Sequence, residues 1–181
     1  MRFTAKTITL KDGRTAILRA PETSDAAELL DYLRTTAGET DFLIRTPEEC
    51  DMTVEQEAAF IESINASPWD MMIVCEVDGR IAGNCQLSCK RRIKSRHRGE
   101  VAIALLKEFW GLGIGTALMQ ELIDEANRRG LMQLELEFIE GNARARALYE
   151  KMGFRIVALR PNATRLPSGK LLHEYIMVLA L

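Results

Sequence analysis

An apolar strand that runs through three alternating glycines into an amphipathic helix is the feature that most constrains this chain. The segment extends from Val101 to Met119, and the glycines stand at positions 111, 113 and 115. Glycine tolerates positive φ and lets a ligand approach the backbone, and the first N–H groups of a helix have no intrahelical acceptor. These groups and the positive end of the helix dipole favour a phosphate or diphosphate. Taken alone, the pattern is equally compatible with an ordinary strand-to-helix turn.

The remaining periodicity predicts an α+β protein with a mixed sheet. A capping box at Thr53 and Gln56, a turn at Asp78-Gly79 and strict alternation over 131–139 give the clearest boundaries. Helices are expected over about 26–38, 53–66, 113–129 and 142–152. Residues 7–19 are expected to form a hairpin or a bulged strand that bends at 12–13, and further strands are expected over 69–77, 81–89, 100–106, 131–139, 154–159 and 170–179. We therefore expect a single domain, residues 1–181, with a central, mostly antiparallel sheet of about seven strands flanked by helices.

Charge and composition narrow the range of partners. The formal net charge of −2 argues against nucleic acid, whose partners usually carry a basic excess. The sequence has no apolar run of about 18 residues, so no membrane contact is expected and the protein is expected to be cytoplasmic. Cysteines 50, 75, 85 and 89 lack metal-ligand spacing and are predicted to be reduced, buried apolar residues, and no metal is expected. The oligomeric state stays open, with a homodimer among the options.

Two motifs resemble those of the GCN5-related N-acetyltransferase (GNAT) superfamily. Leu105–Gly115 is similar to the family's acetyl-CoA loop, and Asn142–Phe154 is similar to its next motif, with a tyrosine seven residues after the asparagine and a closing Gly-Phe. The order of predicted elements matches over nearly the whole chain. One departure is Trp110, which stands where the family often has Gln or Arg. The resemblance implies transfer of an acetyl group from acetyl-CoA to a primary amine of a small molecule or a protein, directly within a ternary complex.

The resemblance also implies roles for individual side chains. Tyr149 matches the tyrosine that gives a proton to the departing sulfur of coenzyme A. An alkylammonium titrates near pH 10 (about 10.4 for Lys), so the acceptor must lose a proton to a base, and Glu100 is the first candidate for it, with Glu137 second. A solvated strand carboxylate is the alternative for both glutamates, and core packing is the alternative for Tyr149.

Cofactor and acceptor contacts follow from the same resemblance. The main chain of the strand and loop, the cap residue of the next helix and two cations of that helix are expected to bind the coenzyme: Ile103, Leu105, Leu106, Trp110, Gly111, Leu112, Gly113, Ile114, Gly115, Thr116, Asn142, Arg146 and Lys151. Arg144, Arg146 and Lys151 are candidates to meet the 3′-phosphate of the coenzyme, and a solvated helix face is the alternative for most of them. Glu39 and Phe42, in the acidic loop 39–51, are expected to bind the acceptor together with Glu137. The pairing of the coenzyme arm requires a free strand edge, which no sequence pattern demonstrates.

Other functions remain to be weighed. A nicotinamide-dependent oxidoreductase would use the glycine loop and a carboxylate about 20 residues later, but the spacing is Gly-x-Gly-x-Gly and only one strand-helix unit follows. A Walker loop lacks its Lys-Ser/Thr. A non-catalytic acyl-CoA-binding sensor would keep the loop without transfer, and the presence of Tyr149 and Glu100 argues against it. The basic turn 90–98 reads as a solvated hairpin tip, with an acidic acceptor or a coenzyme phosphate as alternatives.

Overall fold

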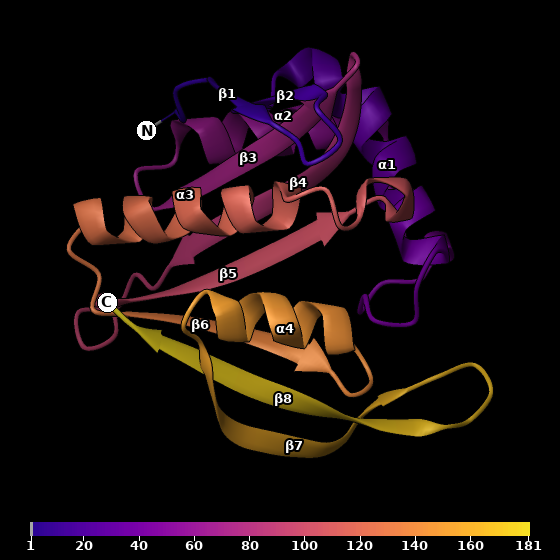
Figure 1. Cartoon of the computed structure of the whole chain (residues 1–181), viewed down its shortest axis with the longest axis vertical. Helices are drawn as coiled ribbons and strands as arrows, with labels where there is room; N and C mark the ends of the chain where they lie inside the picture. Colours follow the sequence, from indigo (N-terminus) through magenta and orange to yellow (C-terminus); the bar gives the residue numbers. More distant parts are fainter. Residues whose placement is uncertain (1) are drawn as a thin grey trace.

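The computed structural model describes residues 2–181 and contains an eight-stranded sheet in the order β1-β2-β3-β4-β5-β6-β8-β7 (Figure 1). The strands are β1 (Lys6–Thr9), β2 (Thr15–Arg19), β3 (Asp70–Val77), β4 (Arg80–Cys89), β5 (Arg98–Leu105), β6 (Gln133–Ile139), β7 (Arg155–Arg165) and β8 (Leu171–Ala180). The sheet has eight strands instead of about seven because the opening stretch turns at Gly13, with φ of 89°, and forms both β1 and β2.

Helices cover both faces of the sheet. The α-helices are α1 (Ala26–Gly38), α2 (Val54–Ala66), α3 (Ile114–Arg128) and α4 (Ala143–Lys151). Figure 1 shows α3 and α4 on the near face, and α1 and α2 behind the sheet. Leu118 and Leu122 of α3 and Leu29 of α1 are fully buried, so each helix turns its apolar stripe inward as its sequence predicts. The predicted capping box at Thr53 is confirmed, since Gln56 N–H donates to the Thr53 hydroxyl at 3.2 Å.

The cysteines pack in the interior, as predicted. Cys50, Cys75, Cys85 and Cys89 are all buried and free. Burial raises the pKa of the Cys75 thiol to about 12 and that of Cys85 well above its ordinary value, because the thiolate would lose its hydration. These thiols therefore behave as small apolar core residues.

The pairing of β5 positions the rest of the site. On one side β5 pairs with β4 continuously, from Gly99↔Cys89 to Leu105↔Gly83. On the other side its parallel pairing with β6 runs only from Arg98↔Gln133 to Glu100↔Glu135. Beyond Glu100 the two strands separate, so the sheet is split between them.

The split leaves one edge of β5 without a strand partner. Leu106 N–H donates to the Ala82 carbonyl at 3.0 Å, so even-numbered residues of this antiparallel ladder point their backbone groups at β4. Ile103 and Leu105 therefore point their N–H and C=O groups to the side from which β6 has withdrawn. This is the free edge that the sequence could not demonstrate.

Two further exclusions follow from the described residues. The β5–β6 pair is the only parallel pair in the sheet formed by residues 2–181, and this topology rules out the repeated parallel units of a dinucleotide-binding fold. None of the helices formed by residues 2–181 has both the length and the apolar character needed to span a bilayer.

Candidate functional site

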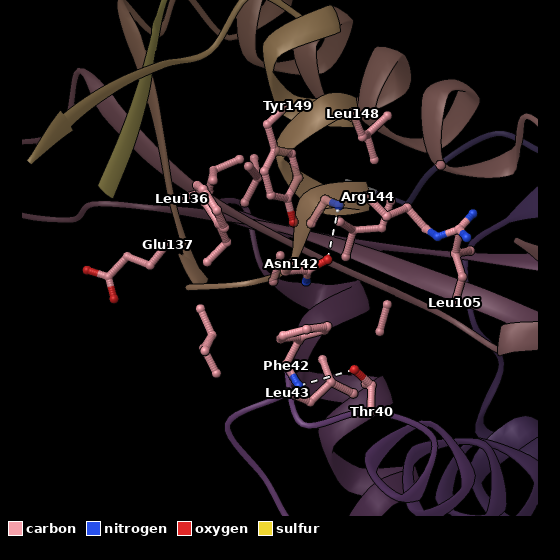
Figure 2. Close-up of a pocket in the computed structure, with 18 of the residues that line it drawn as sticks. Thr40, Phe42, Leu43, Leu105, Leu136, Glu137, Asn142, Arg144, Leu148 and Tyr149 are labelled. Atoms are coloured by element: carbon pink, nitrogen blue, oxygen red, sulfur yellow. Dashed lines mark hydrogen bonds between the residues drawn. The ribbon is translucent and has the colours of Figure 1, made fainter. Parts of the chain in front are cut away.

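A cavity of about 930 Å³ lies where β5 and β6 separate (Figure 2). Its walls come from β5, the glycine loop, β6, the first turns of α4 and the segment after α1. The cavity reaches both faces of the sheet, because its lining includes Gly115 and Leu148 on the α3–α4 side and Gln86, Glu100 and Glu174 on the other. Two molecules can thus approach the same point from opposite faces.

The glycine loop forms a cradle of backbone N–H groups at one end of the cavity. Gly111 and Gly113 have φ of 81° and 97°, in the left-handed region that favours glycine. The first bond of the α3 ladder runs from Ala117 N–H to the Gly113 carbonyl at 3.1 Å, so the N–H groups of residues 114–116 precede the ladder. No side chain caps this helix end within the described chain. An anion such as a phosphate fits these donors.

Gly115 is favoured by close packing rather than by a positive φ. A Cβ built at this position would lie 3.2 Å from Leu148 Cδ2 and 3.5 Å from Leu105 Cδ1. The absence of a side chain therefore lets α3 approach α4 and β5 closely at the cavity wall. This contact keeps the cradle beside the free edge of β5.

Tyr149 lies on α4 with its ring packed between aromatic neighbours. Its ring centroid is 6.1 Å from that of Phe138 and 6.2 Å from that of Phe154, and only 7% of the residue is exposed. Figure 2 shows its hydroxyl pointing into the cavity, beside Asn142. Burial raises the pKa of Tyr149 to about 12, so the phenol stays protonated at neutral pH. The ring of Tyr149 is thus packed in the core while its hydroxyl keeps a proton that it can donate.

Asn142 begins α4 and borders the cavity. Its Oδ1 accepts a hydrogen bond from Ala145 N–H at 3.1 Å, which is the predicted cap. The cap uses the carbonyl oxygen of the amide, and the amide nitrogen makes no hydrogen bond within residues 2–181.

Glu100 and Glu137 both line the cavity, and both are ion-paired. Glu100 Oε1 bonds to Lys90, and its side chain is 54% exposed. Arg160 donates to both oxygens of Glu137, at 2.9 and 3.2 Å, and also bonds to Glu174. Figure 2 shows the Glu137 carboxylate pointing away from the Tyr149 hydroxyl. Burial and the nearby Glu137 charge raise the pKa of Glu174, which the sequence analysis did not single out.

Most of the predicted site residues meet in this one cavity. Its lining includes Phe42, Glu100, Ile103, Leu105, Trp110, Gly111, Gly113, Gly115, Thr116, Glu137, Asn142 and Tyr149. Lys151 lies just outside, with its Nζ 3.4 Å from the Thr116 hydroxyl. Phe42 reaches the far end of the cavity, where a Cβ at Gly141 would lie 3.4 Å from its ring.

Other predicted residues are used elsewhere. Glu39 accepts a hydrogen bond from Lys107 N–H at 2.7 Å, and Arg146 forms an i,i+4 ion pair with Glu150 at 2.8 Å, so neither side chain joins the cavity lining. Leu106 is buried, with its N–H donated to β4, which takes both its side chain and its N–H away from the free edge.

Ile114 and Leu112 of the glycine loop present main-chain groups, rather than side chains, near the cavity. The side chain of Ile114 is buried in the core, so its N–H is the group available at the cradle. Lys11 N–H donates a hydrogen bond to the Leu112 carbonyl at 3.1 Å. That bond brings Lys11, a cation that sequence reasoning missed, into the cavity lining. A contact across more than a hundred residues leaves no local sequence signal.

The basic turn lies away from the cradle. Lys90 N–H donates to the Arg98 carbonyl at the start of β5, whereas the glycine loop follows the end of that strand (Figure 1). Three of its cations have partners, in the pairs Lys90–Glu100, Arg91–Asp70 and Arg98–Glu135. The placement at opposite ends of β5 rules out a contact between this turn and a phosphate held in the cradle.

The fold and the cavity together define a protein with a split mixed sheet and a cradle of backbone N–H groups beside a free strand edge. Residues 35–154 match the model of the Acetyltransferase (GNAT) family, and the chain belongs to this family. An acetyltransferase of the GNAT family from Streptococcus pneumoniae has a similar structure, with a TM-score of 0.87 and 29% identity over 92% of this chain and 99% of that one.

Two further proteins illustrate the range of relatives. The [ribosomal protein bS18]-alanine N-acetyltransferase of Salmonella typhimurium is 39% identical over 79 residues, which are 44% of this chain and 51% of that protein. The chain therefore matches about half the length of this curated relative. A phosphinothricin acetyltransferase from Sinorhizobium meliloti, solved in complex with AcCoA, shares the fold, with a TM-score of 0.78 and 24% identity over 92% of this chain and 88% of that one.

Proposed function

We propose that residues 1–181 act as one acetyl-CoA-dependent N-acetyltransferase domain that transfers an acetyl group to a primary amine in a ternary complex. The observation that carries this proposal is the meeting of a free β5 edge, a glycine cradle and the Tyr149 hydroxyl in one cavity open to both faces of the sheet. Membership of the GNAT family and the activities named for its relatives support it.

The residues present fit the coenzyme. A peptide-like arm can pair with the N–H and C=O groups of Ile103 along the free edge of β5, as an added strand pairs with a sheet. The N–H groups of residues 111–116 suit a diphosphate at the cradle. When bound there, acetyl-CoA would supply the thioester from which the acetyl group is transferred.

Each proton movement has a residue of this chain beside it. Glu100 takes a proton from the acceptor amine, directly or through water, since only one of its oxygens is paired with Lys90. Ile103 N–H, free of strand pairing, polarises the carbonyl. The hydroxyl of Tyr149 gives its proton to the sulfur that leaves. Glu137 is the second candidate for the base, but Arg160 holds both of its oxygens.

The position of the cysteines supports direct transfer. All four are buried outside the cavity lining of residues 2–181, so none can carry an acyl group between the two substrates. The raised pKa values of the Cys75 and Cys85 thiols also keep these two side chains unreactive. These reduced thiols fit the cytoplasm as the location of the protein.

The acceptor end of the cavity favours a cationic amine. Glu100, Glu137 and Glu174 face it from three strands, and Phe42 covers its far side. The relatives named as alanine N-acetyltransferases of a ribosomal protein point to the α-amine of a protein N-terminus as the first acceptor to test.

The deciding experiment joins binding to transfer. Thermal unfolding is followed with acetyl-CoA, NAD or ATP, and thiol release is then measured with an alanine-starting peptide, its N-terminally blocked form, a polyamine and phosphinothricin. Stabilisation by acetyl-CoA and thiol release with at least one amine are expected. Stabilisation by NAD alone would overturn the proposal, and binding without release for any amine would favour the sensor.

A further inference from the structure

Trp110 occupies the end of the free strand edge. Its indole Nε1 donates to the Leu105 carbonyl at 2.9 Å. That carbonyl points toward the side from which β6 has withdrawn, so the indole supplies a hydrogen bond that the sheet does not. The ring is therefore fixed beside the glycine cradle, at the position where the sequence departs from the family pattern.

Arg144 approaches this ring from the opposite wall. It is the second residue of α4, and its guanidinium carbon lies 4.7 Å from the centroid of the Trp110 ring. Figure 2 shows the side chain extending from α4 toward the Leu105 end of β5. Stacking on an aromatic face holds a guanidinium in place without using its N–H groups.

The N–H groups of Arg144 remain available within the described chain. The neighbouring Arg146 is paired with Glu150, whereas the guanidinium of Arg144 has neither a hydrogen bond nor an ion pair with any of residues 2–181. A guanidinium that is positioned by a ring and has all its donors free can bind a phosphate through two parallel bonds.

Charges are distributed unequally along the cavity. The cations of its lining, Lys11 and Arg144, lie at the cradle end, whereas its carboxylates, Glu100, Glu135, Glu137 and Glu174, come from the opposite face of the sheet. An anion entering the cavity is thus drawn to the cradle and kept from the acceptor end.

We infer that Arg144, seated on Trp110, binds the diphosphate of the coenzyme from the α4 side while the glycine loop binds it from the α3 side. This inference rests on the proposed function and assigns a binding role to a pair that joins the two walls of the cavity. Trp110 acts as a positioning residue, because it touches Arg144 and the strand edge rather than the phosphate.

The test measures coenzyme binding by calorimetry, and steady-state kinetics in parallel, for the wild type, Arg144→Gln and Arg144→Lys. For Arg144→Gln the Kd and the KM of acetyl-CoA are expected to rise roughly tenfold while kcat stays within about twofold, and Lys recovers part of the loss because it keeps the charge without the fork. Arg155→Gln, which removes an exposed cation outside the cavity lining, is the matched control and is expected to bind like the wild type.

Truncated ligands identify the phosphate that is bound. S-acetylpantetheine lacks all phosphates and is expected to bind Arg144→Gln and the wild type equally. Dephospho-coenzyme A keeps the diphosphate, so it is expected to show the same loss as acetyl-CoA. A loss that disappears with dephospho-coenzyme A would place Arg144 on the 3′-phosphate and overturn the assignment.

Trp110→Leu tests the positioning role. Without the ring, the Arg144 guanidinium loses the surface on which it stacks, so Trp110→Leu alone is expected to weaken coenzyme binding. The double variant Trp110→Leu, Arg144→Gln is expected to bind the coenzyme no more weakly than Arg144→Gln alone. Fully additive losses would contradict the coupling. If the wild type binds no acetyl-CoA, the proposed function itself fails; if it binds normally and Arg144→Gln binds equally well, only the present inference fails.

Discussion

The ring of Tyr149 lies 6.1 Å from the ring of Phe138, on the strand that has separated from β5. Phe154 follows the end of α4, and its ring centroid lies 6.2 Å from that of Tyr149. The position of the phenol is thus set by ring packing, and its hydroxyl is left for chemistry. The two functions of the side chain can therefore be separated by substitution.

Tyr149→Phe keeps the packed ring and removes only the proton donor. Because a general acid typically contributes about 10²–10⁴ in rate, kcat is expected to fall about 100-fold, while the KM of acetyl-CoA and the melting temperature change little. Stopped assays of thiol release and a thermal melt check this. An unchanged kcat would remove Tyr149 from the mechanism.

The base is identified by comparing Glu100→Gln with Glu137→Gln. Glu100 has one oxygen paired and Glu137 has both, so Glu100→Gln is expected to lower kcat/KM about 100-fold at pH 7 and Glu137→Gln less than tenfold. The loss in Glu100→Gln should shrink at higher pH, where the amine loses its proton without help. The reverse order of the two losses would assign the base to Glu137.

The cradle is tested at the two ends of α3. Gly113 and Gly130 have φ of 97° and 68°, and a Cβ at either position meets nothing closer than 3.9 Å. Ala at each is expected to lower the free energy of unfolding by about 1–2 kcal/mol, because a left-handed backbone disfavours a side chain. Only Gly113→Ala should also raise the KM of acetyl-CoA. An equal KM in both variants would show that the cradle does not bind the coenzyme.

The pH profile of transfer is expected to lack an alkaline limb. Burial raises the pKa of Tyr149 to about 12, so the donor stays protonated up to pH 10. With a peptide α-amine as acceptor, kcat/KM should rise to a plateau above about pH 8, where the amine is neutral. A decline with an apparent pKa near 9 would contradict the donor role.

The same shift affects stability in a defined range. The folded pKa of Tyr149 lies above the ordinary value of 10, so its contribution to stability is complete below pH 10 and is lost as the pH rises toward 12. Chemical denaturation between pH 8 and 11 measures this loss, and Tyr149→Phe is its control. A profile for the wild type that matches the variant up to pH 11 would rule out the contribution.

Local sequence patterns predicted most elements of the fold because their causes are local. The capping box at Thr53, the turn at Gly79 and the alternation of β6 each depend on residues a few positions apart. The cavity residues on the glycine loop and α4 were predicted from the resemblance of the two motifs to those of the GNAT family.

The split and the long-range contacts could not be predicted in this way. The pattern of β5 is the same whether Ile103 has one strand partner or two, so periodicity could not show where β6 withdraws. The same holds for Glu39, whose hydrogen bond goes to Lys107 N–H, and for Lys11, which reaches the cavity through Leu112. These contacts depend on tertiary packing.

The one-sided pairing of β5 has a consequence for amide exchange with solvent deuterium. Ala102 points its N–H at β4, whereas Ile103 and Leu105 point theirs at the split, so protection is expected to alternate residue by residue along a single strand. A ligand that fills the split would slow the unprotected amides and leave the others as they are. The exchange rates of the Ile103 and Leu105 amides would thus report whether a ligand occupies the split, in an experiment that needs neither an acceptor nor turnover.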